Sequence, residues 1–177
     1  PVLESRPTEP GGPGVNHEMG KSANKWVVAD GMTPFRHVGT AIIAGIGART
    51  IIDIIEAGPR PKSLLLHTPD DPPVLRRYLA SHGWHIDCER LAREGRRIAE
   101  VICASEGEER AEGLILDYGP RLLEQRDPLL IEHLDKLVAR WQRIAHSTAN
   151  RAIEAHEHAL AQIGFLNQQL DKVTPRL

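Results

Sequence analysis

The chain has 177 residues, and its 22 Lys and Arg against 24 Asp and Glu give a formal net charge of −2. This balance argues against nonspecific binding of duplex nucleic acid, and an aromatic content of 4% argues against a single-strand reader built from rows of stacking rings. The two cysteines, Cys88 and Cys103, are too few for a disulfide scaffold or a four-cysteine zinc site. No apolar run approaches the ~20 residues that span a bilayer. The composition therefore predicts a soluble cytoplasmic protein without a metal centre or a membrane span.

The distribution of proline and glycine predicts two parts. Short apolar runs alternate with Gly and Pro in the first part, whereas residues 121–173 contain a single proline and a single glycine. We expect the boundary between Gly107 and Pro120, with a sheet domain at 1–110 and a helical hairpin at 120–177. The chain starts at Pro1 without a signal-peptide pattern, which predicts that it begins inside a longer protein.

Strands alternate with helices through most of the first part. The strands are short and almost wholly apolar, which is typical of a mostly parallel sheet covered by helices on both faces. The two helices are each followed by glycine, at Gly58 and Gly83. In chain order, we expect strands at residues 1–3, 26–29 and 40–44, a helix at 51–57, a strand at 63–66 and a helix at 74–82.

The last elements of the first part predict an antiparallel hairpin, formed by residues 84–91 and 97–104 around a turn at Gly95. Two amphipathic helices follow, because apolar residues recur at steps of three and four. Residues 147–150 supply capping side chains between them, so an antiparallel coiled-coil hairpin is expected rather than one rod. The predicted seams are Leu130, Leu134, Leu137, Trp141 and Ile144 in one helix, and Ile153, His156, Leu160, Ile163, Asn167 and Leu170 in the other.

Carboxylates and glycines follow the predicted strands. Glu4 follows the first strand, Asp30-Gly31 the second, and Ala44-Gly45-Ile46-Gly47 ends the third. In doubly wound sheets, ligands bind beyond the carboxyl ends of the strands, and glycines there let the backbone approach the ligand. An Asp at position 30 could accept a hydrogen bond from an adenine amino group. A simple turn explains Asp-Gly equally well, and Gly-x-Gly alone is a weak fingerprint.

Six sequence features between Val27 and Leu137 occur together in one order. The stretches read VVADGM, TAIIAGIGA, SLLLHTPDDPPVLRRYLASHGWHI, RRIAEVICA and YGPRLLEQRDPLLIEHLDKL. They resemble the bacterial tRNA (adenine(22)-N(1))-methyltransferases, in which the corresponding features are a GDG turn, an AGMGG loop, a strand ending in QPN, an A-L-R-x-W-L helix, a G-Y-x-I strand and a GP-x-LL helix entry. The combination, rather than any one motif, carries the resemblance.

The resemblance implies an α/β fold, namely a partial Rossmann-like class I methyltransferase sheet with a helical extension. It implies methylation of N1 of an adenine in tRNA, at position 22, with S-adenosyl-L-methionine as the methyl donor. It makes Glu4 the ribose ligand, Asp30 and Gly31 the adenine-side ligands, and Ala44, Gly45, Ile46 and Gly47 the loop beside the methyl group. The family's first strand and its donor-binding loop would precede Pro1.

Basic side chains are candidates for the tRNA backbone. Arg76 and Arg77 lie on the helix predicted at 74–82, and Arg140 and Arg143 lie near the tip of the helical hairpin. A solvated charged surface is the alternative for Arg76 and Arg77, and a role in packing alone is the alternative for the helices that carry Arg140 and Arg143. A second hypothesis for the whole chain is a non-catalytic RNA- or protein-binding descendant of the fold, because His67-Thr68-Pro69 stands where the family has QPN.

Overall fold

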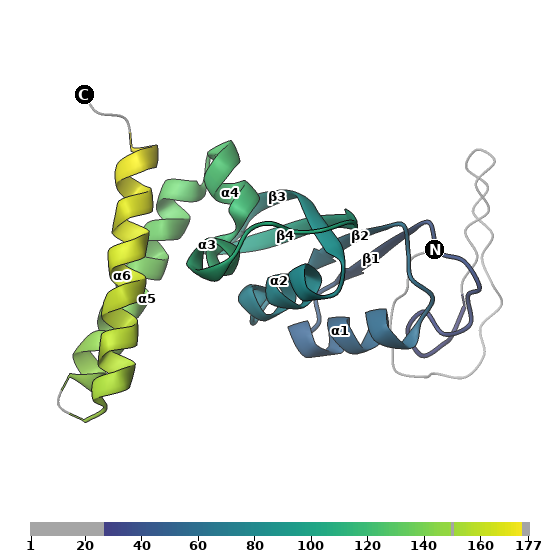
Figure 1. Ribbon diagram of the computed structural model, residues 1–177, viewed down its shortest axis with the longest axis horizontal. Coiled ribbons are helices and arrows are strands. Elements are labelled where there is room, and N and C mark those ends of the chain that lie inside the picture. The colour runs from purple at the N-terminus through teal and green to yellow at the C-terminus, as the bar shows by residue number, and fades with distance from the viewer. Residues whose placement is uncertain (1–26, 150, 175–177) are drawn as a thin grey trace.

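A computed structural model describes residues 27–149 and 151–174. Figure 1 shows a four-stranded sheet with its helices at one end of the molecule and a pair of long helices at the other. The elements are β1 (Thr40–Ala44), α1 (Ala48–Ala57), β2 (Ser63–His67), α2 (Pro72–Ser81), β3 (Trp84–Glu94), β4 (Arg97–Glu106), α3 (Gly113–Tyr118), α4 (Pro120–Gln125), α5 (Leu130–Thr148) and α6 (Ile153–Val173).

The sheet has the strand order β1-β2-β4-β3. β1 and β2 are parallel, and β4 is antiparallel to both β2 and β3. The register places Ile42 opposite Leu65 and Leu65 opposite Cys103, and a bulge interrupts β3 between Ile86 and Cys88. The expected parallel strands followed by an antiparallel hairpin are thereby confirmed.

Helices cover one face of the sheet, not two. Alternate residues of β1 and β2, such as Ile43 and Leu66, are buried on the face that α1 and α2 cover (Figure 1). On the opposite face, Ile42 is 50% exposed. The expectation of helices on both faces is therefore wrong for the residues that the structure describes, because both crossover helices lie on the same side.

The strand expected at residues 26–29 is also a wrong prediction for the described residues 27–29. Residues 27–29 are described, and they pair with no strand. Val28 is fully exposed. A β-strand is stable only when its backbone groups pair with a neighbour, and apolar composition alone does not supply one. The strand expected at 1–3 lies outside the described residues.

Two hydrophobic clusters form the core. The first lies between the sheet and its helices and includes Ile51, Leu66 and Trp84, whose ring lies 4.0 Å from the guanidinium carbon of Arg60. The second lies among the four helices α3, α4, α5 and α6 and includes Leu91 of β3. The second cluster thus extends into the sheet, and we retain the division into 1–110 and 120–177 as a proposal.

Gly119 separates α3 from α4. Its φ is +90°, and an added Cβ would lie 2.8 Å from the Leu122 side chain and 2.9 Å from the Arg76 guanidinium. Glycine is therefore required both for the backbone conformation and for the close approach. Pro120, directly after it, begins α4, where its missing N–H is not needed.

α5 and α6 pack side by side as an antiparallel hairpin (Figure 1), joined by residues 149–152. In α5, Leu130 and Leu134 of the expected seam are buried. In α6 the expected seam is wrong in part, because Ile153 is 74% exposed and Leu160 is 49% exposed, whereas Leu170 packs against the second cluster. The buried residues of α6 are Ala159, Gln162, Leu166 and Gln169.

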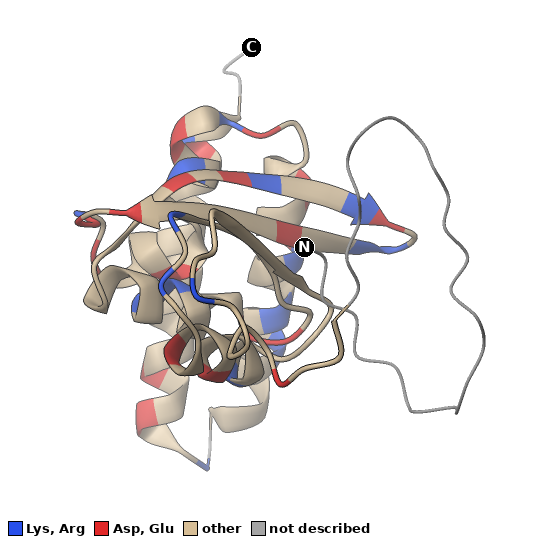
Figure 2. Ribbon diagram, turned by 90° about the vertical axis from the view of Figure 1, so that its right-hand side faces the viewer, with Lys and Arg blue, Asp and Glu red and all other residues tan. Residues whose placement is uncertain are grey.

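The charged surface is mixed in sign. Arg and Glu side chains lie at the turn of the β3–β4 hairpin (Figure 2), at positions 93, 94, 96 and 97, and Arg93 pairs with Glu132 of α5. Among the described helices, none combines the length and the apolar composition that crossing a membrane requires.

Candidate functional site

The loop between β1 and α1 lies at the carboxyl end of the parallel strands. Gly45 has a φ of +78°, which favours glycine, and its N–H donates to the His67 carbonyl at the end of β2, at 3.2 Å. Among the described residues, and apart from its two chain neighbours, no atom lies within 4 Å of the position that a Cβ on Gly45 would take. The backbone of this loop is therefore open on one side, as a ligand-binding loop requires.

Asp70 connects this loop to the segment after β2. Its carboxylate accepts hydrogen bonds from the Thr68 hydroxyl at 2.5 Å and from the Ala48 N–H at 3.0 Å. These bonds, with one from the Asp71 N–H, lower the pKa of Asp70. A Cβ on Gly47 would lie 2.9 Å from Asp70 Oδ2, so glycine is needed for the contact.

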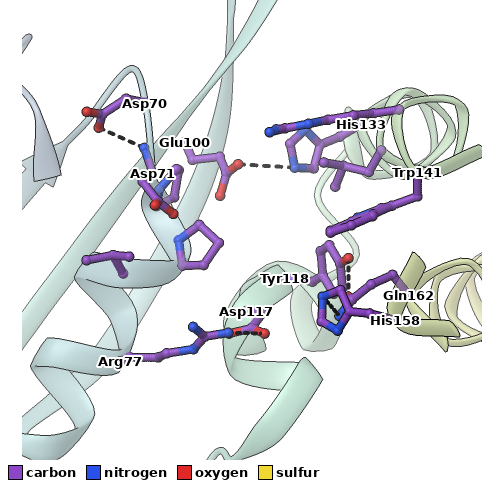
Figure 3. A pocket seen from close by; sticks show the side chains of 15 residues that line it. Asp70, Asp71, Arg77, Glu100, Asp117, Tyr118, His133, Trp141, His158 and Gln162 are labelled. Carbon is purple, nitrogen blue, oxygen red and sulfur yellow. Dashed lines mark hydrogen bonds and ion pairs between the residues drawn. The ribbon is translucent and has the colours of Figure 1, made fainter. Parts of the chain in front are cut away.

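A cleft of about 350 Å³ begins beside Asp70 and continues between α2 and the helical hairpin. Figure 3 shows charged side chains of the sheet and α2 on one side of it, and aromatic and imidazole side chains on the other. Its lining residues come from five segments, namely α2 with the turn before it, β4, α3, α5 and α6. The labelled ones are Asp70, Asp71, Arg77, Glu100, Asp117, Tyr118, His133, Trp141, His158 and Gln162.

Buried ion pairs fix the wall of the cleft at Glu100. Arg76 is 1% exposed, and it donates to Glu89 at 2.6 Å, to Glu100 at 2.5 Å and to the Asp117 carbonyl at 3.0 Å. His133 of α5 lies 3.3 Å from Glu100. Burial alone would raise the pKa of Glu100, but Arg76 and His133 outweigh it and lower this pKa to about 2. The ionised Glu100 therefore ties the sheet to α5.

The helical side of the cleft is held by neutral contacts. Tyr118 donates from its hydroxyl to Gln162 Oε1 at 2.5 Å and stacks on Phe165 at a centroid distance of 5.6 Å. Burial raises the pKa of Tyr118 to about 12, which keeps the hydroxyl protonated as a donor. Trp141 meets His158 edge-on at 5.5 Å.

The model of the tRNA (adenine(22)-N(1))-methyltransferase family, TrmK, matches residues 14–171. The chain belongs to this family. No protein of curated function matches it.

Solved structures share the fold. A Streptococcus agalactiae protein of the NADB-Rossmann superfamily is 22% identical, with a TM-score of 0.73 over 81% of this chain and 66% of that one. A putative tRNA (m1A22) methyltransferase of Streptococcus pneumoniae is 21% identical, with a TM-score of 0.69 over 76% of this chain and 62% of that one. The Bacillus subtilis TrmK is 19% identical, with a TM-score of 0.65 over 75% and 63%. The chain thus spans less than two thirds of the length of each of these proteins.

The expected donor ligands of this TrmK-family chain do not come together in the described structure. A Cβ on Gly31 would lie 3.2 Å from Ile54, and Met32 packs against Gly58 at the C-terminal end of α1. The loop of Ala44, Gly45, Ile46 and Gly47 precedes the N-terminus of the same helix. Asp30 and Gly31 therefore lie at the opposite end of α1 from that loop. Glu4 lies outside the described residues.

The expected tRNA contacts divide into two groups. The expected tRNA contact of Arg76 is wrong, because this side chain is buried and its guanidinium already donates to three protein acceptors. Arg77 and Arg140 line the cleft from opposite sides. Arg143 lies one turn beyond Arg140, and both line a shallow open depression on α5 with Ile144 and Ser147.

Several cleft residues were not anticipated from the sequence. Asp70 and Asp71 precede Pro72-Pro73, a pattern that signals a helix start and hence a carboxylate pair at the end of β2. Trp141 was expected only as part of a packing seam. Nothing in the local sequence indicates that Tyr118 and His158 lie near it, because they come from α3 and α6.

Proposed function

We propose that the chain takes part in methylation of N1 of adenine 22 in tRNA, with S-adenosyl-L-methionine as the methyl donor. The observation that carries this proposal is its membership of the TrmK family over residues 14–171. Two relatives support the donor: the Streptococcus pneumoniae protein is solved with S-adenosyl-L-methionine, and the M. capricolum TrmK with S-adenosyl-homocysteine. A tRNA substrate makes the cytoplasm the expected compartment.

The loop at residues 44–47 fits a role beside the donor. Its backbone is open at Gly45, and Gly47 lets it approach Asp70 closely. Loops beyond the carboxyl ends of parallel strands form the ligand crevice of open α/β sheets. When bound there, the donor supplies a methyl group on a positively charged sulfur, and the chain's own residues orient it.

Adenine N1 requires positioning more than a strong base. N1 lies on the Watson–Crick edge, so the base must leave its stack before the N1 lone pair can face the methyl group. Arg77 and Arg140 line the cleft and Arg143 lines the depression beside it, which supports a role for them in holding tRNA phosphates while the base is out of the stack.

The test measures donor binding and methylation separately. Binding of S-adenosyl-homocysteine is followed by calorimetry, and methylation of tRNA transcripts with A or G at position 22 is followed by mass spectrometry. We expect methylation of the A22 transcript only. Gly47→Ala should weaken S-adenosyl-homocysteine binding at least tenfold, because its Cβ displaces Asp70, whereas Gly39→Ala, which meets no atom within 4 Å, should not.

A non-catalytic RNA-binding descendant is the second candidate. His67-Thr68-Pro69 differs from the family's QPN, and both polar side chains are engaged: His67 Nδ1 lies 3.1 Å from the Glu100 carbonyl, and Thr68 bonds Asp70. This candidate predicts no S-adenosyl-homocysteine binding and a tRNA mobility shift that survives Asp30→Ala. The shift would be lost in the Arg140→Ala/Arg143→Ala variant.

A further inference from the structure

The cleft between α2 and the helical hairpin has the size of a small-molecule site. Its volume of about 350 Å³ lies at the lower end of the roughly 300–1,000 Å³ typical of ligand pockets. It opens beside Asp70, at the carboxyl ends of β1 and β2. A single nucleotide, rather than a stretch of duplex, matches this volume.

One wall offers a fixed aromatic ring. Trp141 is half-buried on α5 and lines the cleft (Figure 3). This wall is restrained by the edge-on contact between Trp141 and His158. It is also restrained by Tyr118, which donates to Gln162 and stacks on Phe165. Any nucleobase can stack on such a ring, because every base has a π face.

The other wall holds a hydrogen-bond acceptor without a donor. Asp117 is 9% exposed, and among the described residues no group donates to its Oδ1. Its Oδ2 accepts from Arg77 at 2.5 Å. Glu100, by contrast, is bonded to Arg76 and paired with His133. A buried acceptor left without a donor is costly, and because Oδ1 is buried while Arg77 holds the other carboxylate oxygen, a ligand N–H gains this acceptor only when Arg77 moves.

Arg77 can pair either with the Asp117 carboxylate or with the phosphate of a ligand. Its side chain is 60% exposed, and Arg140 of α5 lines the same cleft. If Arg77 turns toward a phosphate, it leaves Asp117, and the carboxylate becomes accessible to a donor inside the cleft. A ligand with both a phosphate and a ring amino group satisfies both side chains at once.

We propose that this cleft binds one unstacked adenine nucleotide, with the base on Trp141, its amino group at Asp117, and its phosphate at Arg77 and Arg140. This inference rests on the proposed function in taking the nucleotide to be the tRNA acceptor. It adds the residues that select adenine, and it gives the helical hairpin a direct part in holding the base.

The test uses the full chain and free nucleotides, so it does not depend on methylation. Binding of AMP, IMP and adenosine at millimolar concentration is measured by ligand-observed NMR. We expect AMP to bind more tightly than IMP, which has a carbonyl in place of the amino group. Trp141→Ala should weaken AMP binding at least tenfold, whereas Trp141→Phe retains most of it. Asp117→Asn should remove the preference for AMP over IMP, and Arg77→Ala should weaken AMP but not adenosine.

Thermal melting and S-adenosyl-homocysteine binding serve as controls, and both should be unchanged in Trp141→Phe. Absence of AMP binding, equal binding of AMP and IMP, or AMP binding that Trp141→Ala leaves intact would each overturn the inference. If tRNA is methylated while any of these holds, the cleft assignment fails and the proposed function stands. If AMP binds as expected but tRNA is not methylated, the proposed function fails and the nucleotide site stands.

Discussion

At the scale of single residues, the most constrained groups are the charges buried beneath the cleft. Arg76 and Glu89 are both almost fully buried, and they meet at 2.6 Å. Such a pair adds little net stability compared with apolar residues, but removal of one partner leaves a buried, uncompensated charge. Arg76 therefore acts as the centre of a structural network and not as an RNA contact.

Arg76→Ala should lower the free energy of unfolding by about 3–5 kcal/mol, because Glu89 and Glu100 would lose their common partner. Arg77→Ala, one residue along the same helix, should cost less than Arg76→Ala, since Arg77 is 60% exposed and pairs with a single carboxylate. Urea denaturation of the two variants checks the difference. Equal losses would contradict a network centred on Arg76.

Glu100 should make stability depend on acid pH. Its pKa falls from 4.5 to about 2 in the folded chain, so its ionised form stabilises the fold above about pH 4.5, and this contribution is lost as the pH falls toward 2. The loss is on the order of 3 kcal/mol. Glu100→Gln should lack this part of the pH dependence. Denaturation of both proteins between pH 6 and pH 2 measures it, and parallel curves would show that Glu100 does not contribute.

At the scale of elements, the helix α6 shows where periodicity misleads. Two stripes of the helix have similar spacing, and the sequence favours the one with Ile153 and Leu160. In the structure, each buried residue of α6 lies one position before a member of the expected seam, and Gln162 accepts a hydrogen bond from Tyr118. These buried residues are Ala159, Gln162, Leu166 and Gln169. Because a partner for a glutamine is supplied by another element, hydrophobicity alone does not identify this face.

The packing of α6 gives a matched pair of substitutions. Leu166 is fully buried in the second core, whereas Leu160 is 49% exposed. Leu166→Ala should destabilise the chain by about 2–5 kcal/mol. Leu160→Ala should change stability by less than about 1 kcal/mol. Thermal or urea unfolding distinguishes the two, and a larger loss at Leu160 would restore the seam expected from the sequence.

At the scale of the whole molecule, a net charge of −2 does not exclude tRNA binding, because charge is distributed unevenly. Arg140 and Arg143 project from one stretch of α5 beside the cleft. An open depression with two guanidinium groups suits a phosphate backbone.

tRNA binding should therefore weaken as salt rises. The Arg140→Ala/Arg143→Ala variant should reduce the slope of log K against log salt by about 1.4–1.8, since each neutralised phosphate contributes roughly 0.7–0.9. Lys62→Ala, at the opposite end of β2 from the cleft, should leave the slope unchanged. Filter binding over a salt series measures both, and an unaltered slope in the double variant would exclude these residues as phosphate contacts.

The sequence by itself determined the elements that depend on local patterns. The apolar runs at 40–44 and 63–66, the glycines after α1 and α2, and the change from short runs to long amphipathic helices all reflect backbone preferences and periodicity. The motif combination likewise indicated the family that the matched model supports. Each apolar run, glycine position and motif lies within one short stretch of consecutive residues, and the resemblance to the family combines several such stretches.

Only the tertiary structure decided what depends on contacts between distant residues. It buried Arg76 between Glu89 and Glu100, exposed Val28 where no strand lies beside it, and separated Asp30 from the loop at 44–47. It also assembled the cleft from α2, α3, α5 and α6. The physical reason is that the environment of a side chain, and hence its charge state and availability, is set by neighbours that the local sequence does not specify.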